Sequence, residues 1–374
     1  MSENASFGAW ERGVGAAEGE PVRLADLEAL ATARLSPGVA SYYSGAANDE
    51  VTLNDNTAAF RRWAFVPRVG VEIEGRDPSV EVLGRRWPVP FMVAPMALMR
   101  MAHPDGELAV ARACTAQGIT FCLSTVGTTT IEDVAAASGA AVGGPNWFQL
   151  YLLRDRERSR ELLARAEAAG NEAIVLTMDA PILGRRERDI RTGFKLPEGI
   201  SYANIRRGAV KRGDTYGDDE LKPSTTWEDL AWVVASTLLP VIVKGVLHPD
   251  DARRALDAGA AGIDVSNHGG RQLDGAIAAL DALPAVAEAV AGWPGRVPVL
   301  LDSGIRRGTD VLMAQALGAT AVMLGRPVLW GLAWAGERGV ATVFDMLRAE
   351  YHLALGLAGL TRAADAGRDL LVRV

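Results

Sequence analysis

The chain has 374 residues, a formal net charge of -7 and only two cysteines, Cys114 and Cys122. The excess of acidic residues gives no support to nucleic-acid binding, which needs a basic surface, and the apolar runs are far shorter than the about 20 residues that span a bilayer. The two cysteines form neither a metal-type pair nor a disulfide framework, so the sequence predicts a cytoplasmic protein with no metal site, no nucleic-acid partner and no membrane partner.

The N-terminal part of the chain is predicted to be an arm followed by a helical cap. Residues 1–20 are polar and lack the basic start and apolar run of a secretory signal, which indicates a flexible arm. Helices are predicted around residues 24–35 and 54–63, and they would cover one end of the fold without forming a separate domain. Residues 21–374 are therefore predicted to form one domain, which a barrel of this length allows.

From Pro88 onward, short apolar runs alternate with amphipathic segments, as they do in chains that form a parallel sheet covered by helices. Eight such runs favour closure of the sheet, so the predicted fold class is α/β, a single (β/α)8 TIM barrel. The predicted strands are residues 91–95, 120–124, 147–151, 173–179, 241–246, 262–267, 299–302 and 321–325.

Two of the intervening helices have clear start and stop signals. Pro249 and two aspartates open a helix that ends at Gly259, and Gly308-Thr309-Asp310 opens another that ends at Gly318. One connection is unusually long, because about 60 residues separate the fourth predicted strand from the fifth. Its polar, Gly-rich part, residues 204–223, is predicted to be either an active-site lid or a disordered loop.

Polar side chains end seven of the eight predicted strands, which is where a barrel gathers the groups that contact its ligand. A few such residues would arise by chance and be satisfied by backbone hydrogen bonds, but seven strands favour a functional site. These residues are Ser124, Gln149, Tyr151, Thr177, Asp179, Lys244, Ser266, Asn267, His268, Asp302 and Arg326.

Charged residues in the fifth, seventh and eighth predicted strand units indicate an anionic ligand. Lys244 stands in an apolar strand, so its ammonium needs either a core carboxylate or a cofactor that gains negative charge. The segments 302–306 and 325–327 each place glycine and arginine after a strand. Barrels often bind phosphate after their seventh and eighth strands, so these segments predict a phosphate site.

The segment Ser-Asn-His-Gly-Gly-Arg-Gln-Leu-Asp-Gly, residues 266–275, closely resembles the signature of the FMN-dependent 2-hydroxy acid oxidase and dehydrogenase family. Glycolate oxidase, lactate oxidase, lactate monooxygenase and mandelate oxidases belong to that family, whose fold is a β/α barrel that binds FMN. The resemblance extends from about Tyr42 to the C-terminal helix. It also covers residues 94–97, 103–107, 148–151, 177–181, 184–186 and 301–304.

The resemblance implies that His268 is the catalytic base and that Asp179 orients it and stabilises its charged form. Whether His268 takes the Cα proton, leaving a carbanion, or the hydroxyl proton as hydride leaves Cα stays open. Arg271 and Arg186 would bind the substrate carboxylate, since a guanidinium group matches its two oxygens. The family also implies that Tyr42 and Tyr151 contact the substrate. From the residues alone, Tyr42 could equally be a core aromatic and Arg186 part of a solvated charge run.

The resemblance also implies how FMN is held. The backbone of Ala94, Pro95, Met96 and Ala97 would lie against the ring system, and Lys244 beside its pyrimidine end. Further polar contacts would come from Ser124, Gln149, Thr177 and Ser266. The phosphate would rest near Asp302, Ser303, Gly304, Arg306, Gly325 and Arg326.

Two departures from the family pattern bear on the activity. Ser303 replaces a frequent glycine, which resembles monooxygenase-like members and alters the phosphate loop. Ala97 is common in oxidases, whereas lactate monooxygenase has glycine there, so Ala97 favours release of H2O2 after reoxidation by O2. We therefore expect an oxidase of lactate, glycolate or mandelate type, and the family implies a homotetramer or homo-octamer.

Three alternatives remain open from the sequence. They are oxidative decarboxylation of the lactate 2-monooxygenase type, a dehydrogenase that uses another electron acceptor, and a non-catalytic barrel that serves as a binding protein. The other histidines, His103, His248 and His352, are interpreted as structural, because two of them stand at helix starts and one in the last helix.

Overall fold

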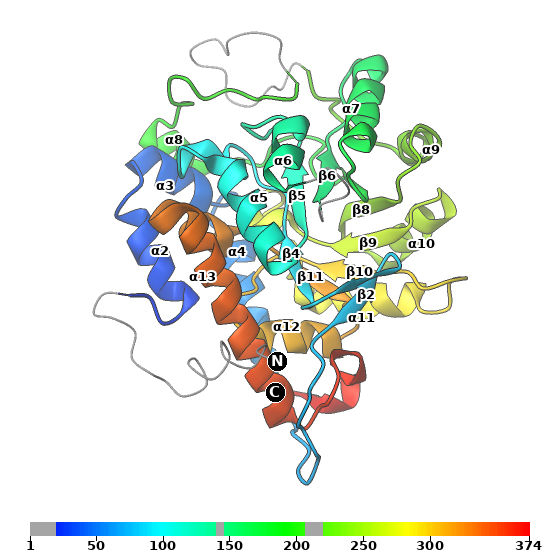
Figure 1. Ribbon diagram of the computed structural model, residues 1–374. Coiled ribbons are helices and arrows are strands. Elements are labelled where there is room, and N and C mark those ends of the chain that lie inside the picture. The colour runs from blue at the N-terminus through cyan, green and yellow to red at the C-terminus, as the bar shows by residue number, and fades with distance from the viewer. Residues whose placement is uncertain (1–19, 140–145, 206–219) are drawn as a thin grey trace.

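A computed structural model describes residues 20–139, 146–205 and 220–374, and within them eight parallel strands form a closed barrel surrounded by helices (Figure 1). The prediction of a (β/α)8 barrel is confirmed. In barrel order the strands are β4 (Phe91–Val93), β5 (Phe121–Ser124), β6 (Asn146–Leu150), β7 (Ile174–Thr177), β8 (Val241–Val246), β9 (Gly262–Val265), β10 (Val299–Leu301) and β11 (Ala321–Leu324).

All eight predicted runs coincide with these strands, although several strands end earlier than predicted. The run 173–179 forms a strand only over Ile174–Thr177, and the run 262–267 only over Gly262–Val265. The strands are mostly apolar because both faces of the sheet are covered. Side chains such as Phe148 and Val243 are fully buried, and each contributes about 1.5–3 kcal/mol to stability.

A helix follows every barrel strand along the chain. The two helices with clear signals form as predicted: α10 begins at Pro249, and the backbone turns left-handed at Gly318 after α12 (φ +112°). The helices are α5 (Gly106–Gln117), α6 (Ile131–Ala137), α7 (Arg156–Ala168), α8 (Glu187–Thr192), α9 (Trp227–Ala235), α10 (Pro249–Asp257), α11 (Ala279–Val290), α12 (Gly308–Ala316) and α13 (Arg326–Ala358).

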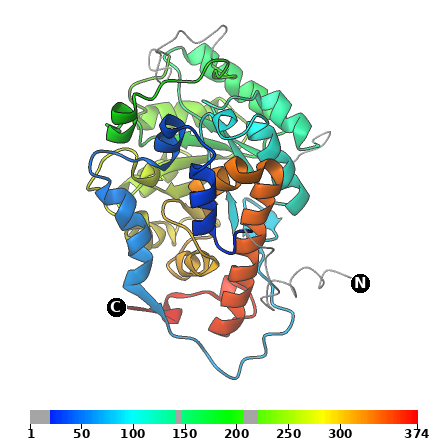
Figure 2. The same cartoon turned by 90° about the vertical axis from the view of Figure 1, so that its left-hand side faces the viewer.

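The N-terminal helices cap the end of the barrel at which the strands finish. In Figure 2 the blue helices lie in front of the barrel, and they are α2 (Leu24–Thr32), α3 (Pro37–Ser44) and α4 (Val51–Ala58). α3 packs against α8, which follows β7, and α4 packs against the short turn η3 (His268–Gly270), which follows β9. The helical cap is therefore confirmed, and it covers the carboxyl end of the strands.

The second cap helix begins earlier than predicted, at Val51 rather than near residue 54, and continues into η1 (Ala59–Arg62). Asn56, a poor helix former, is tolerated in α4 because its side chain forms two hydrogen bonds with the side chain of Asn267, at 2.7 and 2.8 Å. This pair ties the cap to the segment that follows β9.

Two small antiparallel sheets lie outside the barrel. β1 (Trp63–Phe65) pairs with β12 (Leu371–Arg373), and β2 (Val80–Val82) pairs with β3 (Arg85–Trp87). None of the helices in the described ranges is both long and apolar enough to cross a membrane.

Two predictions concern residues that the structure does not describe. The predicted N-terminal arm, residues 1–20, lies outside the described residues except for Glu20, and so does most of the predicted lid or disordered loop, residues 206–219. The described parts of that long connection carry α8 and α9.

Candidate active site

A cavity of about 510 Å³ opens at the carboxyl end of the barrel, and residues from all eight strand units contribute to its wall. This volume lies in the range of sites that bind cofactors and small ligands. Most predicted site residues line it together: Tyr42, Ala94, Pro95, Met96, Ala97, Ser124, Tyr151, Thr177, Arg186, Lys244, His268, Arg271, Asp302, Ser303, Gly304, Arg306, Gly325 and Arg326.

His268 is held at the rim of the cavity by two fixed contacts. Its Nδ1 lies 2.9 Å from Asp179 Oδ1, and its backbone N–H donates to Ser266 Oγ at 3.0 Å. Its other ring nitrogen, Nε2, lies 3.5 Å from the hydroxyl of Tyr151. A carboxylate at Nδ1 fixes the tautomer in which Nδ1 carries the proton, which leaves the Nε2 lone pair to accept another. The imidazole is therefore arranged as a general base.

Gly245 allows Asp179 to reach His268. Its backbone is left-handed (φ +104°), and a Cβ at this position would lie 2.4 Å from the Cβ of Asp179. Both constraints require glycine, because a side chain would be strained and would push Asp179 away from His268. The residue after Lys244 thus sets the position of the carboxylate that orients His268.

Arg271, Arg186 and Tyr42 line one side of the cavity, and the two arginines give this side a positive charge. Arg271 donates from Nη1 to the backbone oxygens of Tyr42 and Gly45, at 2.7 and 2.9 Å, and its guanidinium lies 5.0 Å from the centre of the Tyr42 ring. Tyr42 is buried and stacks on Phe194 with ring centres 4.8 Å apart. Arg186 is half-buried and lines the same cavity. Tyr42 is thus both a core aromatic and a wall residue, and Arg186 is more than part of a solvated charge run.

Lys244 lies at the floor of the cavity and pairs with two buried carboxylates. Its Nζ donates to Asp264 Oδ2 at 3.0 Å, to Ser266 Oγ at 2.7 Å and to Asp302 Oδ2. Burial alone would lower the pKa of Lys244, but the two carboxylates raise it above its ordinary value. The structural interpretation of Lys244 as part of a core ion pair is therefore confirmed, and the residue also lines the cavity.

The loop after β10 and the start of α13 concentrate positive charge. Arg326 donates to the backbone oxygens of Tyr43, Gly45 and Gly269 at 3.0 to 3.1 Å. Burial, followed by the repulsion of Arg271 and Arg306, lowers the pKa of Arg326 to about 9. Carbonyl groups satisfy its donors without neutralising its charge, so this end of the cavity favours an anion.

Ser303 shapes the same loop. It has a left-handed backbone (φ +75°), a conformation in which glycine is the least strained residue. Its hydroxyl accepts a hydrogen bond from the Gly269 N–H at 3.0 Å and donates to Asp302 Oδ1 at 2.7 Å. These two bonds hold the strained turn and link it to the segment that carries His268.

Three predicted site residues lie behind the cavity wall rather than in it. Asp179 contacts His268, and Ser266 contacts Lys244 and the His268 N–H. Gln149 accepts from Ser124 Oγ at 2.9 Å and donates to Thr177 Oγ1 at 3.0 Å. In this arrangement these three residues position the side chains that line the cavity.

Sequence reasoning missed two buried residues near the cavity. Tyr43 lines its wall and donates from its hydroxyl to the Leu98 carbonyl at 2.7 Å. Asp264 holds Lys244 from below. A signal for Asp264 was present, because it is the only acidic residue in the run 262–267 and Lys244 required a partner.

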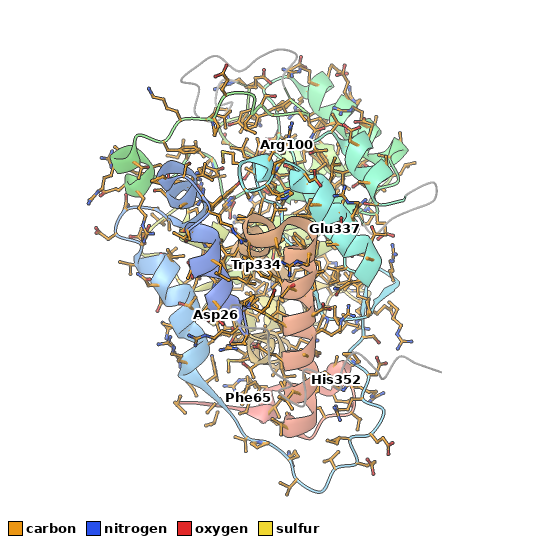
Figure 3. The ribbon with its side chains drawn as sticks, turned by 60° about the vertical axis from the view of Figure 1, so that its left-hand side comes forward. Asp26, Phe65, Arg100, Trp334, Glu337 and His352 are labelled. Atoms are coloured by element: carbon orange, nitrogen blue, oxygen red, sulfur yellow. The ribbon has the colours of Figure 1, made fainter. Side chains whose placement is uncertain are left out.

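The remaining histidines lie away from the cavity, in agreement with their structural interpretation. His103 packs against Gly336, where α13 changes direction, and His248 caps α10 by accepting from the Asp250 N–H at 3.1 Å. Figure 3 places His352 near the far end of the straight part of α13 from Glu337. Among the described residues, no group of three or more metal-ligating side chains is present.

Comparison with known proteins identifies the family. The model of the FMN-dependent dehydrogenase family matches residues 31–373. The chain is 45% identical to an L-lactate oxidase of Nostoc sp., with 94% of this chain and 98% of that protein covered, and 45% identical to a 4-hydroxymandelate oxidase of Amycolatopsis orientalis, with 93% and 97% covered. A crystal structure of a mandelate oxidase, 43% identical, superposes with a TM-score of 0.86 over 95% of this chain and 99% of that one. The chain therefore belongs to the FMN-dependent dehydrogenase family, is an oxidoreductase and uses FMN as its cofactor.

Proposed function

We propose that the protein oxidises a small L-2-hydroxy acid to the corresponding 2-oxo acid and that O2 accepts the electrons, giving H2O2. One observation carries the proposal: an imidazole oriented by a carboxylate stands beside Arg271 on the wall of one cavity. Such a pair can remove a proton, and the guanidinium group can bind a carboxylate. Relatives that match most of the chain are named L-lactate oxidase, 2-hydroxyacid oxidase and 4-hydroxymandelate oxidase.

The residues of the cavity fit FMN. Arg306 and Arg326 suit its phosphate, because their charges are buried and only partly compensated by carboxylates. Lys244, Ser124 and Thr177 suit the polar edge of the ring system, and the backbone of residues 94–97 its face. When bound there, FMN supplies the acceptor for two electrons.

Arg271 and Arg186 bind and orient the substrate carboxylate in this proposal. A planar guanidinium offers two parallel donors to two carboxylate oxygens, so it fixes direction as well as position. Two hydrogen bonds to backbone oxygens hold Arg271 itself in place. Tyr42, beneath the Arg271 guanidinium, adds its hydroxyl to the same carboxylate.

His268 then removes one proton from the substrate. Nε2 accepts it, and Asp179 stabilises the resulting imidazolium through Nδ1. The Tyr151 hydroxyl stays protonated, because burial raises its pKa above the ordinary value, and it donates to the substrate hydroxyl. The proton comes from either Cα or the hydroxyl group, and these residues can serve both routes.

The apolar part of the wall sets the substrate class. Val126, Leu152, Met178, Leu183 and Leu221 all line the cavity, and Leu183 is 39% exposed. A small or aromatic side chain would be desolvated there without loss of hydrogen bonds. We therefore propose substrates of the lactate, glycolate or mandelate type.

The experiment is anaerobic mixing of the FMN-loaded protein with L-lactate, glycolate or L-mandelate. We expect the 450 nm absorbance of the flavin to bleach with at least one of them, to return on admission of O2, and to yield one H2O2 per substrate oxidised. No bleaching by any 2-hydroxy acid would contradict the proposal.

Two outcomes would instead support the alternatives that the sequence left open. Product that has lost CO2, without free H2O2, would indicate the monooxygenase reaction. Fast bleaching with very slow recovery in O2 would indicate a dehydrogenase that uses another acceptor. The side chain of Ala97 on the cavity wall favours the oxidase, because it leaves less space beside the ring system than glycine would.

Residues 21–374 are proposed to form the single catalytic domain, in a cytoplasmic homotetramer or homo-octamer. Exposed apolar side chains near the rim support association of subunits: Val51 is 56% exposed, Ile182 78% and Leu273 74%. Cys114 and Cys122 are free and buried, which is compatible with a reducing compartment. Light scattering on the FMN-loaded protein measures the assembly, and a monomer would contradict it.

A further inference from the structure

Asp264 is a buried charge that the proposed mechanism does not use. It stands in the middle of β9, is completely buried, and pairs in register with Lys244 of β8 and Leu300 of β10. A carboxylate in an apolar strand costs free energy unless it is paired or protonated. Its position therefore calls for an explanation in terms of what it contacts.

The contacts of Asp264 connect it to the cavity through a single residue. Its Oδ2 accepts from Lys244 Nζ at 3.0 Å, while its Oδ1 has no hydrogen-bond partner among the described residues. Lys244 lines the cavity and Asp264 does not. Asp264 therefore does not contact a molecule bound in the cavity; it can act on one through the Lys244 ammonium that it holds and through the net charge of the cluster.

The cluster contains one more carboxylate than its single ammonium can balance. Lys244 pairs with both Asp264 and Asp302. Burial raises the pKa of Asp264 to about 8; Lys244 opposes this rise, whereas Asp302 and Asp179 add to it. Cys122 of β5 also faces the cluster, and burial raises the pKa of its thiol.

Asp264 is the member of this cluster whose charge can change near neutral pH. Burial raises the pKa of Asp302, but the charge of Lys244 and hydrogen bonds to the carboxylate outweigh burial and lower that pKa, whereas the pKa of Lys244 is raised. Above the pKa of Asp264 the cluster carries one negative charge, and below that pKa it is neutral. An oxygen without a partner, Oδ1, is available for the proton.

We propose that Asp264 is a positioning residue of the flavin site: it holds the Lys244 ammonium beneath the cavity and, by gaining or losing a proton on its carboxyl group, sets the charge that this cluster presents to the ring system of FMN. The inference rests on the proposed placement of the cofactor beside Lys244. Because two-electron reduction adds negative charge to the ring system, a neutral cluster favours reduction more than a negative one.

The test measures the midpoint potential of bound FMN from pH 6 to pH 9.5 against a reference dye. In Asp264→Asn and Asp264→Ser the cluster stays neutral at every pH. At pH 9.5 we expect their equilibrium constant for reduction to exceed that of the wild type about tenfold, which a two-electron couple reports as about 30 mV. At pH 6 the three proteins should agree within a factor of two.

The wild type alone provides a second measurement. Reduction of FMN raises the pKa of Asp264. At pH values between the pKa of Asp264 in the oxidised protein and its pKa in the reduced protein, reduction is therefore accompanied by the uptake of one extra proton. The wild-type potential should therefore fall more steeply with pH in that interval, and the two variants should lack this segment. Asp345→Asn is the matched control, since Asp345 lies on the outer helix α13 and accepts from Gln117. Its profile should equal that of the wild type.

Profiles of the Asp264 variants that superpose on the wild type would overturn the proposal. If neither variant retains FMN, a wild-type profile without the steeper segment would overturn it equally. The variant Lys244→Met distinguishes a failure of the proposed role of Asp264 from a failure of the proposed flavin site. A lower potential in Lys244→Met supports the placement of the cofactor beside Lys244, whereas an unchanged potential would contradict both that placement and the role of Asp264.

Discussion

The two charged clusters of this cavity differ in exposure and in charge balance. At the rim, His268 pairs with one carboxylate, and the two side chains are 20% and 11% exposed. At the floor, Lys244 pairs with two carboxylates, and its side chain and that of Asp264 are 4% and 0% exposed. Buried charges are stable only when they stay paired, whereas a partly exposed imidazole can exchange a proton with a ligand. The rim cluster is suited to proton exchange with a ligand, and the floor cluster to acting on a ligand through its charge.

Removal of the His268 imidazole at the rim should have the largest effect on activity. In His268→Ala we expect anaerobic flavin bleaching to slow by about 1000-fold, because the proton acceptor is lost. FMN should remain bound, since the floor cluster is intact. Stopped-flow absorbance measures the rate. His248→Ala, which removes an exposed helix cap, is the control and should bleach normally. An unchanged rate in His268→Ala would exclude this residue as the base.

A smaller effect should follow from Arg271→Lys, which keeps the charge at the rim and loses the planar guanidinium. We expect kcat/KM to fall about 30-fold, or about 2 kcal/mol, mostly through KM, because an ammonium cannot hold both carboxylate oxygens and both backbone oxygens. Steady-state kinetics measure it. Arg185→Lys, at an exposed neighbour of Arg186, should change neither constant. Equal KM values for both variants would argue against Arg271 as a carboxylate ligand.

Gly245 follows Lys244 of the floor cluster and lies against Asp179 of the rim cluster. Its substitution tests how much stability depends on this close contact. A Cβ there would clash with Asp179, whereas at Gly75, also left-handed (φ +70°), it would meet nothing within 4 Å. We expect Gly75→Ala to lower the free energy of unfolding by about 1 kcal/mol through backbone strain, and Gly245→Ala by about 2 kcal/mol more. Urea titration measures both. Equal losses would show that Asp179 moves aside without cost.

The last test concerns the pH dependence of stability. The pKa of Asp264 is raised to about 8 in the folded protein, so between its unfolded value, about 4, and pH 8 the folded state binds the extra proton. Stability therefore decreases as pH rises through this interval. Asp264→Asn does not lose stability in this way, so its free energy of unfolding should rise relative to that of the wild type by up to about 1.4 kcal/mol per pH unit. Urea midpoints at pH 5.5 and 7.5 test this. A constant difference would contradict the raised pKa.

Most of the barrel could be predicted from the sequence, because a strand covered on both faces is a short apolar run between helix signals. The run 241–246 has the bounds of β8, and Pro249 marks the start of α10. The rim could be predicted for the same reason: Ser124, Thr177 and His268 interrupt or follow apolar runs, and the carboxyl ends of all eight strands meet at one place.

The remaining features depend on distances that no local pattern encodes. Ala173 to Asp179 looks continuous, yet the strand ends at Thr177, since where hydrogen bonding stops depends on the neighbouring strand. Gln149 and Ser266, which are predicted to contact the cofactor, form hydrogen bonds with residues of the cavity wall, and such contacts between strands cannot be read from the sequence. Asp264 is a partial exception: the sequence showed that Lys244 needs a partner, but only the pairing of neighbouring strands brings in Asp264, 20 residues away along the chain.

The three backbone oxygens that hold Arg326 have a consequence for handling the protein. They come from α3, the residue after it and the turn η3, so one guanidinium links the cap, the His268 segment and α13. In the proposed placement of FMN, the Arg326 charge, which carboxylates compensate only in part, makes that junction a place where a bound phosphate group adds to stability. Stripping the flavin should therefore loosen the cap first, and sulfate or phosphate in the buffer should protect the apoprotein during reconstitution.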